Sequence, residues 1–218
     1  MLQINSLVSR IASTAMVAFM AWGCSTATTD IDTSFDMPTG LTIAGTTGQR
    51  LFVANTGEDA LQVLELGEDL SAIDPVEGPS FYFPLRIPGG PAPEEIVATD
   101  DGRFVVVLNW VTNNLHLIDA DTLDNALSDG NDVEIDLGTE PNPYRIVSLQ
   151  DACAASNLEN CSGHLLISYP GSGHIAEWTV QDGAAGPMVE PGETYTVDGS
   201  PGEIVASPDG QFLFAADT

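Results

Sequence analysis

The feature that most constrains this chain is an internal repeat with a period near 54. Residues 95–109 (EIVATDDGRFVVVLN) align without a gap with residues 203–217, which lie 108 positions downstream. An earlier copy occupies residues 41–55, 54 positions upstream. A looser copy begins at residues 145–150 and continues at 163–169 after an insertion. A period of this length indicates a chain built from similar, stacked structural units.

Each copy predicts the same series of short strands. An apolar strand at 96–98 meets an Asp-Gly turn, where Gly102 tolerates positive φ. The continuous apolar run that comes next predicts a strand buried on both faces, and a polar turn at 109–114 then leads into the alternating strand 115–119. A fourth strand is expected to close each unit, at residues 81–85, 133–137 and 194–197. Four antiparallel strands per unit, with no helical periodicity between them, are typical of a propeller blade.

The repeated pattern resembles the YVTN-type β-propeller family, which is similar to quinoprotein and lactonase propellers. The residues that carry the resemblance are Pro-x-Glu-Ile-Val-x-x-Asp-Asp-Gly-x-Phe-Val-Val-Val-Leu-Asn, followed by Leu-x-Leu-Ile-Asp. The resemblance covers the chain from Gly40 to Thr218 and implies an all-β propeller of four-stranded antiparallel blades. A β-sandwich is the alternative fold, but its strands would not keep a period near 54. Such repeats scaffold many unrelated activities, so they do not identify the function.

The repeats predict about three and a half blades. Three occupy residues 40–88, 93–138 and 143–199, and a fourth at 200–218 stops after its second strand. We therefore expect a truncated product, a gene fragment or one half of a split ring. Open apolar blade faces and an unpaired strand edge would make the isolated chain self-associate.

The N-terminus is predicted to be a lipoprotein signal peptide. Residues 1–23 contain no acidic residue, and the apolar stretch 11–23 is too short to cross a bilayer as a helix. The segment Ala21-Trp22-Gly23-Cys24 resembles the bacterial lipobox, in which a cysteine is lipidated before cleavage. The resemblance implies acylation of Cys24, and three acyl chains would anchor the protein firmly. An ordinary signal peptide with a chance cysteine is the alternative.

The residues after Cys24 bear on localisation. Ser25 stands where an aspartate would favour retention in the inner membrane, so the sorting rule implies the outer membrane of a Gram-negative cell. The polar residues that continue to position 39 are interpreted as a flexible tether, so 24–39 forms a lipidated linker. The lipid anchor makes the membrane one predicted partner. The second predicted partner is a protein or small molecule that the sequence does not identify.

Two further cysteines suit an exported protein. Cys153 and Cys161 enclose seven residues, and an oxidising compartment favours a disulfide between them. A metal site is the competing interpretation, but two cysteines with wide spacing and no fixed histidine pattern are a weak signature. His164 lies nearby, within a predicted strand.

The charge of the chain is one-sided, with 32 acidic residues against five arginines and no lysine. A net charge of −27 repels phosphates and excludes nucleic acid as a partner. The acidity indicates either a solvated surface, suited to a salty habitat, or attraction of Ca²⁺ and cationic partners. Residues 121–132 carry oxygen ligands that Ca²⁺ accepts, but they lack EF-hand spacing, which favours a solvated turn.

The candidate ligand site lies at the mouth of the propeller channel. Glu95, Arg145 and Glu203 occupy equivalent positions at the start of three successive innermost strands. This acidic–basic–acidic set either binds a polar ligand or a cation, or simply neutralises itself across the channel. His116 is expected to face solvent or an adjacent blade, and His164 and His174 are too few and unpartnered for a metal site.

Three functional hypotheses remain from the sequence. The first is a membrane-anchored binding scaffold without catalysis, because no Gly-x-Ser-x-Gly, Walker, dinucleotide or His-Glu-x-x-His motif occurs. The second is part of a lactonase-like or quinoprotein-like enzyme, since the resemblance implies acidic and basic residues in the central funnel. The third is a remnant without independent function. No catalytic or metal-binding residue is assigned, and no cofactor is expected apart from the Ca²⁺ considered above.

Overall fold

The computed structural model describes residues 37–47, 49–67, 73–75, 86–88, 90–124, 134–138, 142–149, 152–155, 160–183, 186–207 and 212–218. All of them belong to one of the chain's two compact units, Ser34–Thr218. Cys24 and the predicted signal peptide lie outside the described residues. Among the described residues, no helix has the length and apolarity that a membrane crossing needs.

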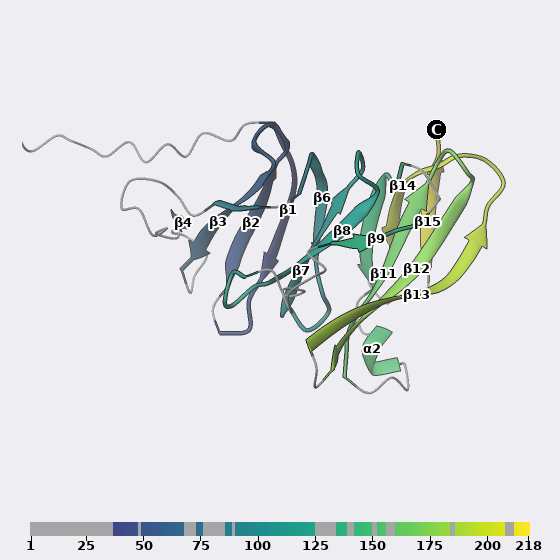
Figure 1. Cartoon of the computed structure of the whole chain (residues 1–218). Coiled ribbons are helices and arrows are strands. Elements are labelled where there is room, and N and C mark those ends of the chain that lie inside the picture. Colours follow the sequence, from purple (N-terminus) through teal and green to yellow (C-terminus); the bar gives the residue numbers. More distant parts are fainter. Residues whose placement is uncertain are drawn as a thin grey trace, which may run out of the picture. The chain divides into compact units, whose positions relative to one another are not determined.

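The described strands form four antiparallel sheets that follow one another along the chain (Figure 1). The first sheet contains β1 (Pro38–Ala44), β2 (Arg50–Asn55), β3 (Ala60–Leu66), β4 (Ile73–Pro75) and β5 (Arg86–Pro88). A short 3-10 helix, η1 (Thr56–Glu58), connects β2 to β3. Both β4 and β5 pair with β3, one at each end of that strand. The fourth strand predicted at 81–85 lies outside the described residues.

The second and third sheets are the four-stranded units that the repeat predicts. The second contains β6 (Pro93–Ala98), β7 (Phe104–Asn109), β8 (Asn114–Asp119) and β9 (Ile135–Asp136). The third contains β10 (Arg145–Leu149), β11 (Cys161–Tyr169), β12 (His174–Gly183) and β13 (Gly186–Thr196). The fourth strand is thus shorter than predicted in the second sheet and longer in the third. A short helix, α2 (Ala152–Ala155), occupies the insertion between β10 and β11.

The fourth sheet consists of β14 (Pro201–Ala206) paired with β15 (Leu213–Asp217). The first strands of the four sheets lie side by side, since β1 contacts β6, β6 contacts β10, and β10 contacts β14. These four are the innermost strands. The fold is therefore a partial β-propeller, as the repeat predicts.

Packing between sheets explains the apolar run in β7. All six residues of this strand are buried. Val105 and Val107 pack against the first sheet, whereas Phe104, Val106 and Leu108 pack against the third. Successive side chains of a strand point to opposite faces, so a strand between two neighbouring sheets needs apolar side chains on both faces, here from Phe104 to Leu108.

A buried polar residue ends the second strand in the first two sheets. The side chain of Asn109 donates to Asn114 Oδ1 across the β7–β8 turn at 3.0 Å, and Asn55 donates to Gln62 Oε1 at 3.4 Å. In the fourth sheet, Asp217 at the equivalent position accepts a hydrogen bond from Ser200 N at 2.7 Å. The Asn or Asp that recurs in the sequence therefore ties each strand end to a neighbouring segment.

Candidate functional site: the channel between the innermost strands

The structure brings together the three residues predicted at the channel mouth. Glu95 lies in β6, Arg145 begins β10 and Glu203 lies in β14. Leu41 lies 54 positions before Glu95 in the sequence and is 69% exposed. An irregularity in β1 shifts its register, so that Leu41 pairs with Val53 and Gly40 lies beside the backbone of Glu95. Repetition of the blade places one residue from each innermost strand at the same level, which is why sequence spacing alone locates this cluster.

Arg145 holds the cluster together. Its Nη1 donates to Glu95 Oε2 at 3.0 Å, while its Nε and Nη2 donate to the two oxygens of Glu203, both at 2.7 Å. The guanidinium also lies 4.9 Å from the centre of the Tyr144 ring. Arginine presents a rigid fork of donors, and the bidentate bond to Glu203 uses that geometry.

The two carboxyl groups respond to Arg145 in opposite ways. Burial raises the pKa of Glu95 above its ordinary value, even though Arg145 acts to lower it. The hydrogen bonds from Arg145 lower the pKa of Glu203, and those same bonds raise the pKa of Arg145. The side chain of Glu95 is 24% exposed and that of Glu203 is 57% exposed. Desolvation therefore dominates at Glu95 and hydrogen bonding at Glu203.

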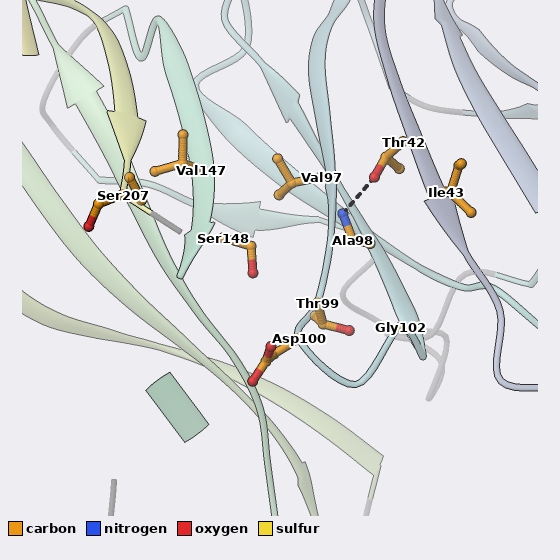
Figure 2. A pocket seen from close by; sticks show the side chains of 11 residues that line it. Thr42, Ile43, Val97, Ala98, Thr99, Asp100, Gly102, Val147, Ser148 and Ser207 are labelled. Atoms are coloured by element: carbon orange, nitrogen blue, oxygen red, sulfur yellow. Dashed lines mark hydrogen bonds between the residues drawn. The ribbon is translucent and has the colours of Figure 1, made fainter. Parts of the chain in front are cut away.

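A cavity of about 640 Å³ lies between the innermost strands at their other ends. Its lining residues come from all four of these strands and the turns after them: Thr42, Ile43, Val97, Ala98, Thr99, Asp100, Gly102, Val147, Ser148, Ala206 and Ser207. Figure 2 shows Val97 and Val147 together, with Ser148, Thr99 and Asp100 below them. The sequence carries no signal for this cavity, because small and apolar residues at strand ends are common everywhere.

Polar groups are distributed unevenly around the cavity. Thr42 Oγ1 accepts a hydrogen bond from Ala98 N at 3.1 Å, which links the first two sheets (Figure 2). Thr99 is held by Asp101 and by the backbone of Phe104. Ser148 Oγ is buried and has no hydrogen-bond partner within the described part of the chain. A buried hydroxyl without a partner is costly, so a ligand or water that binds Ser148 would satisfy it.

The histidines lie away from the channel, on β8, β11 and β12. His116 is only 7% exposed and lies against Gly90, so the expectation that it could face solvent is wrong. Burial lowers the pKa of His116. His164 is not unpartnered as expected, because its Nδ1 lies 2.9 Å from Glu177 Oε1.

The turn considered for Ca²⁺ is engaged in holding two sheets together. Asp121 accepts hydrogen bonds from Thr46 N at 3.0 Å and Thr47 N at 3.1 Å, and from both threonine hydroxyls. These bonds, that from the Thr46 hydroxyl first, lower the pKa of Asp121 to about 2. Its oxygens therefore serve the contact with the turn after β1. The rest of the candidate loop, 125–132, lies outside the described residues.

The predicted disulfide is present, linking Cys153 in α2 to Cys161 at the start of β11. It fastens the insertion of the third blade to the strand that comes after it. His164 lies close to both sulfur atoms.

Comparisons with known proteins show similarity in fold. No protein-family model matches the chain, and no curated protein matches its sequence. The periplasmic gluconolactonase of Pseudomonas aeruginosa is 16% identical, with a TM-score of 0.54 over 84% of this chain and 50% of that one. A putative 6-phosphogluconolactonase from Bacteroides uniformis is 12% identical, with a TM-score of 0.52 over 83% and 47%. The hydrazine synthase of Kuenenia stuttgartiensis is 19% identical, with a TM-score of 0.55 over 87% and 44%.

The chain thus spans about half the length of these solved structures. At sequence identities between 12% and 19%, the similarity shows that the folds are alike but not that the chemistry is. The two structures named as lactonases agree with a lactonase-like propeller architecture for this chain.

Proposed function

We propose that the chain is an exported, lipid-anchored β-propeller that binds a small polar molecule of neutral or positive charge in its channel, without catalysis. The main support for this proposal is the cavity that residues from all four innermost strands line. Its volume lies within the range of ordinary ligand sites, and such sites combine an apolar lining with a few polar groups.

The charge of the ligand follows from where the arginines are. Arg145 is engaged by Glu95 and Glu203. Arg50 donates to backbone carbonyl groups, and Arg103 pairs with Asp182. Asp100 is the one charged residue among those that line the cavity in the described part of the chain. With no lysine in the sequence, a phosphorylated ligand would find no free cation there.

Ligand-observed NMR tests this proposal with three probes: glucose, putrescine and glucose 6-phosphate. We expect saturation transfer to glucose or putrescine and none to the phosphate ester. Ser148→Leu narrows the cavity and removes its buried hydroxyl group, and it should abolish the signal. Thr194→Leu changes a residue that lines a separate pocket and should preserve the signal. Equal binding of glucose 6-phosphate, or binding unaffected by Ser148→Leu, would refute the proposal.

Lactone hydrolysis is the second candidate, favoured by one observation at the channel mouth. Glu95 is partly buried, has a raised pKa and lies beside a guanidinium, which suits a general acid or base. Two of the solved structures described above are named as lactonases. Hydrolysis of glucono-1,5-lactone that disappears in Glu95→Gln and persists in Glu94→Gln would establish this candidate. We expect no hydrolysis above the buffer rate.

The proposed anchor and the proposed membership of the YVTN-type repeat family rest on sequence patterns. Lipidation is supported by the lipobox-like segment that ends at Cys24, and the repeat family by the period near 54. Metabolic labelling with a fatty acid should mark the wild-type protein and Cys153→Ser but not Cys24→Ser. Fractionation of the envelope should then place the labelled protein in the outer membrane.

A further inference from the structure

Three residues that can ligate a metal gather beside the third sheet. Cys153 comes from α2, while Cys161 and His164 lie at the start of β11. One ligand atom from each, the two sulfurs and a ring nitrogen, lie within 4.8 Å of one another. A tetrahedral zinc site, with bonds of about 2.0–2.3 Å, needs its ligand atoms about 3.3–3.8 Å apart. The three groups are therefore close enough to share one ion after small movements.

A β-bulge explains why Cys161 and His164 share a face. Residues three apart in a regular strand point to opposite sides of the sheet. In the β11–β12 pair, Cys161 lies opposite Gln181 and Gly163 lies opposite Val180, so one extra residue is inserted at this point. The extra residue turns Cys161 to the side on which His164 lies. Bulges often re-aim side chains in this way beside functional sites.

The imidazole of His164 is already oriented as a metal ligand requires. Its Nδ1 lies 2.9 Å from Glu177 Oε1, and the other oxygen of Glu177 accepts a hydrogen bond from Tyr195 at 3.3 Å. A carboxylate that accepts the Nδ1 proton leaves a lone pair on Nε2. This Nε2 is buried and has no hydrogen-bond partner in the described part of the chain. Ligating histidines in zinc sites commonly have such a carboxylate partner, which fixes the tautomer.

We propose that reduction of the Cys153–Cys161 disulfide converts this group into a binding site for Zn²⁺ or a similar thiolate-preferring divalent ion. A dithiol reductant supplies two electrons and two protons, becomes a disulfide itself, and leaves two thiols on the protein. Metal binding then releases the two thiol protons and forms two metal–sulfur bonds and one metal–nitrogen bond. Water takes the fourth position. Glu177 is a positioning residue, because it acts on the metal through His164.

The disulfide and the metal therefore exclude each other. A disulfide cannot supply the two thiolates, so the oxidised protein does not bind the ion. Conversely, the ion stabilises the dithiol and makes the disulfide easier to reduce. Each of the three residues is partly buried, so none is sealed completely inside the protein. The site would thus report both the redox state of its compartment and the availability of metal.

Titration with Co²⁺ tests the ligand set on the full chain, reduced with dithiothreitol and then desalted. We expect a sulfur-to-cobalt charge-transfer band that saturates at one equivalent and is removed by Zn²⁺, and no band from the oxidised protein. His164→Gln should weaken binding at least tenfold. Glu177→Gln should keep the band and weaken binding by about 10-fold to 100-fold. His174→Gln, at the other end of the β11–β12 hairpin, is the matched control and should bind as the wild type does.

The midpoint potential of the disulfide gives a second measurement that starts from the oxidised, folded protein. Thiol alkylation in a dithiol/disulfide buffer reports the reduced fraction with and without Zn²⁺. With Zn²⁺ at about 100 times its Kd, the equilibrium should shift about 100-fold toward the dithiol, which is about 60 mV for a two-electron couple. Circular dichroism of the reduced samples checks that the sheets persist. A midpoint that Zn²⁺ leaves unchanged, or cobalt binding that is as tight in His164→Gln as in the wild type, would overturn the proposal.

Discussion

Replacing Arg145 with methionine tests whether charge pairing holds three blades together at the channel mouth. Methionine keeps much of the apolar stem but removes three hydrogen bonds. The pair with the exposed Glu203 is worth at most about 1 kcal/mol. The bond to the less exposed Glu95 is worth about 1.5–3 kcal/mol, because a partly buried carboxylate is left without its partner. We expect a loss of about 3 kcal/mol at pH 7, and thus a fall in Tm of about 6–12 °C.

The pH dependence of this loss separates charge from packing. Arg145 acts to lower the pKa of Glu95, so its removal raises that pKa further above the ordinary 4.5. A carboxyl group whose pKa is higher in the folded than in the unfolded protein destabilises the fold only when it is ionised. It therefore costs no stability at pH values below its unfolded-state pKa, and its full cost appears only above its folded-state pKa. In the wild type, the contribution of Glu203, whose pKa is lowered, is present at pH 7 and fades as pH falls below 4.5. Both effects make the gap between wild type and Arg145→Met smaller at pH 4 than at pH 7.

Urea denaturation followed by circular dichroism, at pH 7 and at pH 4, measures the gap. The double variant Glu95→Gln/Arg145→Met should lose less than the two single variants together. Arg50→Met is the matched control, since Arg50 donates mainly to carbonyl oxygens that do not titrate, each at 2.7 Å. Its loss should be similar at both pH values. If the gap for Arg145→Met is also independent of pH, packing on Tyr144 and not charge pairing accounts for it.

Three further changes test other parts of the structure. The bonds that lower the pKa of Asp121 to about 2 contribute stability that is present above its ordinary 3.8 and lost as pH falls toward 2. Asp121→Asn should therefore cost about 1 kcal/mol at pH 7, after allowance for solvent screening, and much less near pH 2 by thermal melts. Gly90→Ala should cost more than about 2 kcal/mol in denaturant titrations, because φ is 87° and the new Cβ would lie 2.6 Å from His116. Gly171→Ala, with no atom within 4 Å of a Cβ, should be nearly neutral, and equal losses at both glycines would contradict this reasoning. Phe214→Asp removes an apolar side chain that is 60% exposed on β15, so light scattering should show less self-association than in the wild type.

Much of the fold follows from local patterns that the chain repeats. The Asp-Gly turn and the apolar run at 104–108 locate β6 and β7 in the sequence, and burial on both faces follows from that run alone. Equivalent positions in the repeat also bring Glu95, Arg145 and Glu203 together, because each blade adds its innermost strand beside the previous one. A period therefore predicts which positions of successive copies become neighbours, however far apart they lie along the chain.

Features that depend on irregularity could not be predicted in this way. Strict alternation along a strand would place Cys161 and His164 on opposite faces of the sheet, and the bulge at Cys161 brings them to the same face. The three-residue spacing of Cys161 and His164 in the sequence therefore does not predict that His164 lies near the sulfurs. The alternation around His116 indicates a face of β8 but not that Gly90 covers it. The cavity beside Ser148 arises where four strand ends meet, and none of its small residues is unusual alone.

The few arginines show how so acidic a chain keeps its blades together. Each of the three whose side chains are described links neighbouring sheets. Arg50 in β2 binds carbonyl groups that follow β8, Arg103 pairs with Asp182 in β12, and Arg145 joins β10 to β6 and β14. Every junction between described sheets therefore carries an arginine, although the net charge is −27. Apolar packing forms the junctions, and repulsion between acidic blades opposes it. The three arginines offset this repulsion at the junctions, where it would otherwise separate the blades. Because all three are engaged in these contacts, none of them is left to bind a ligand.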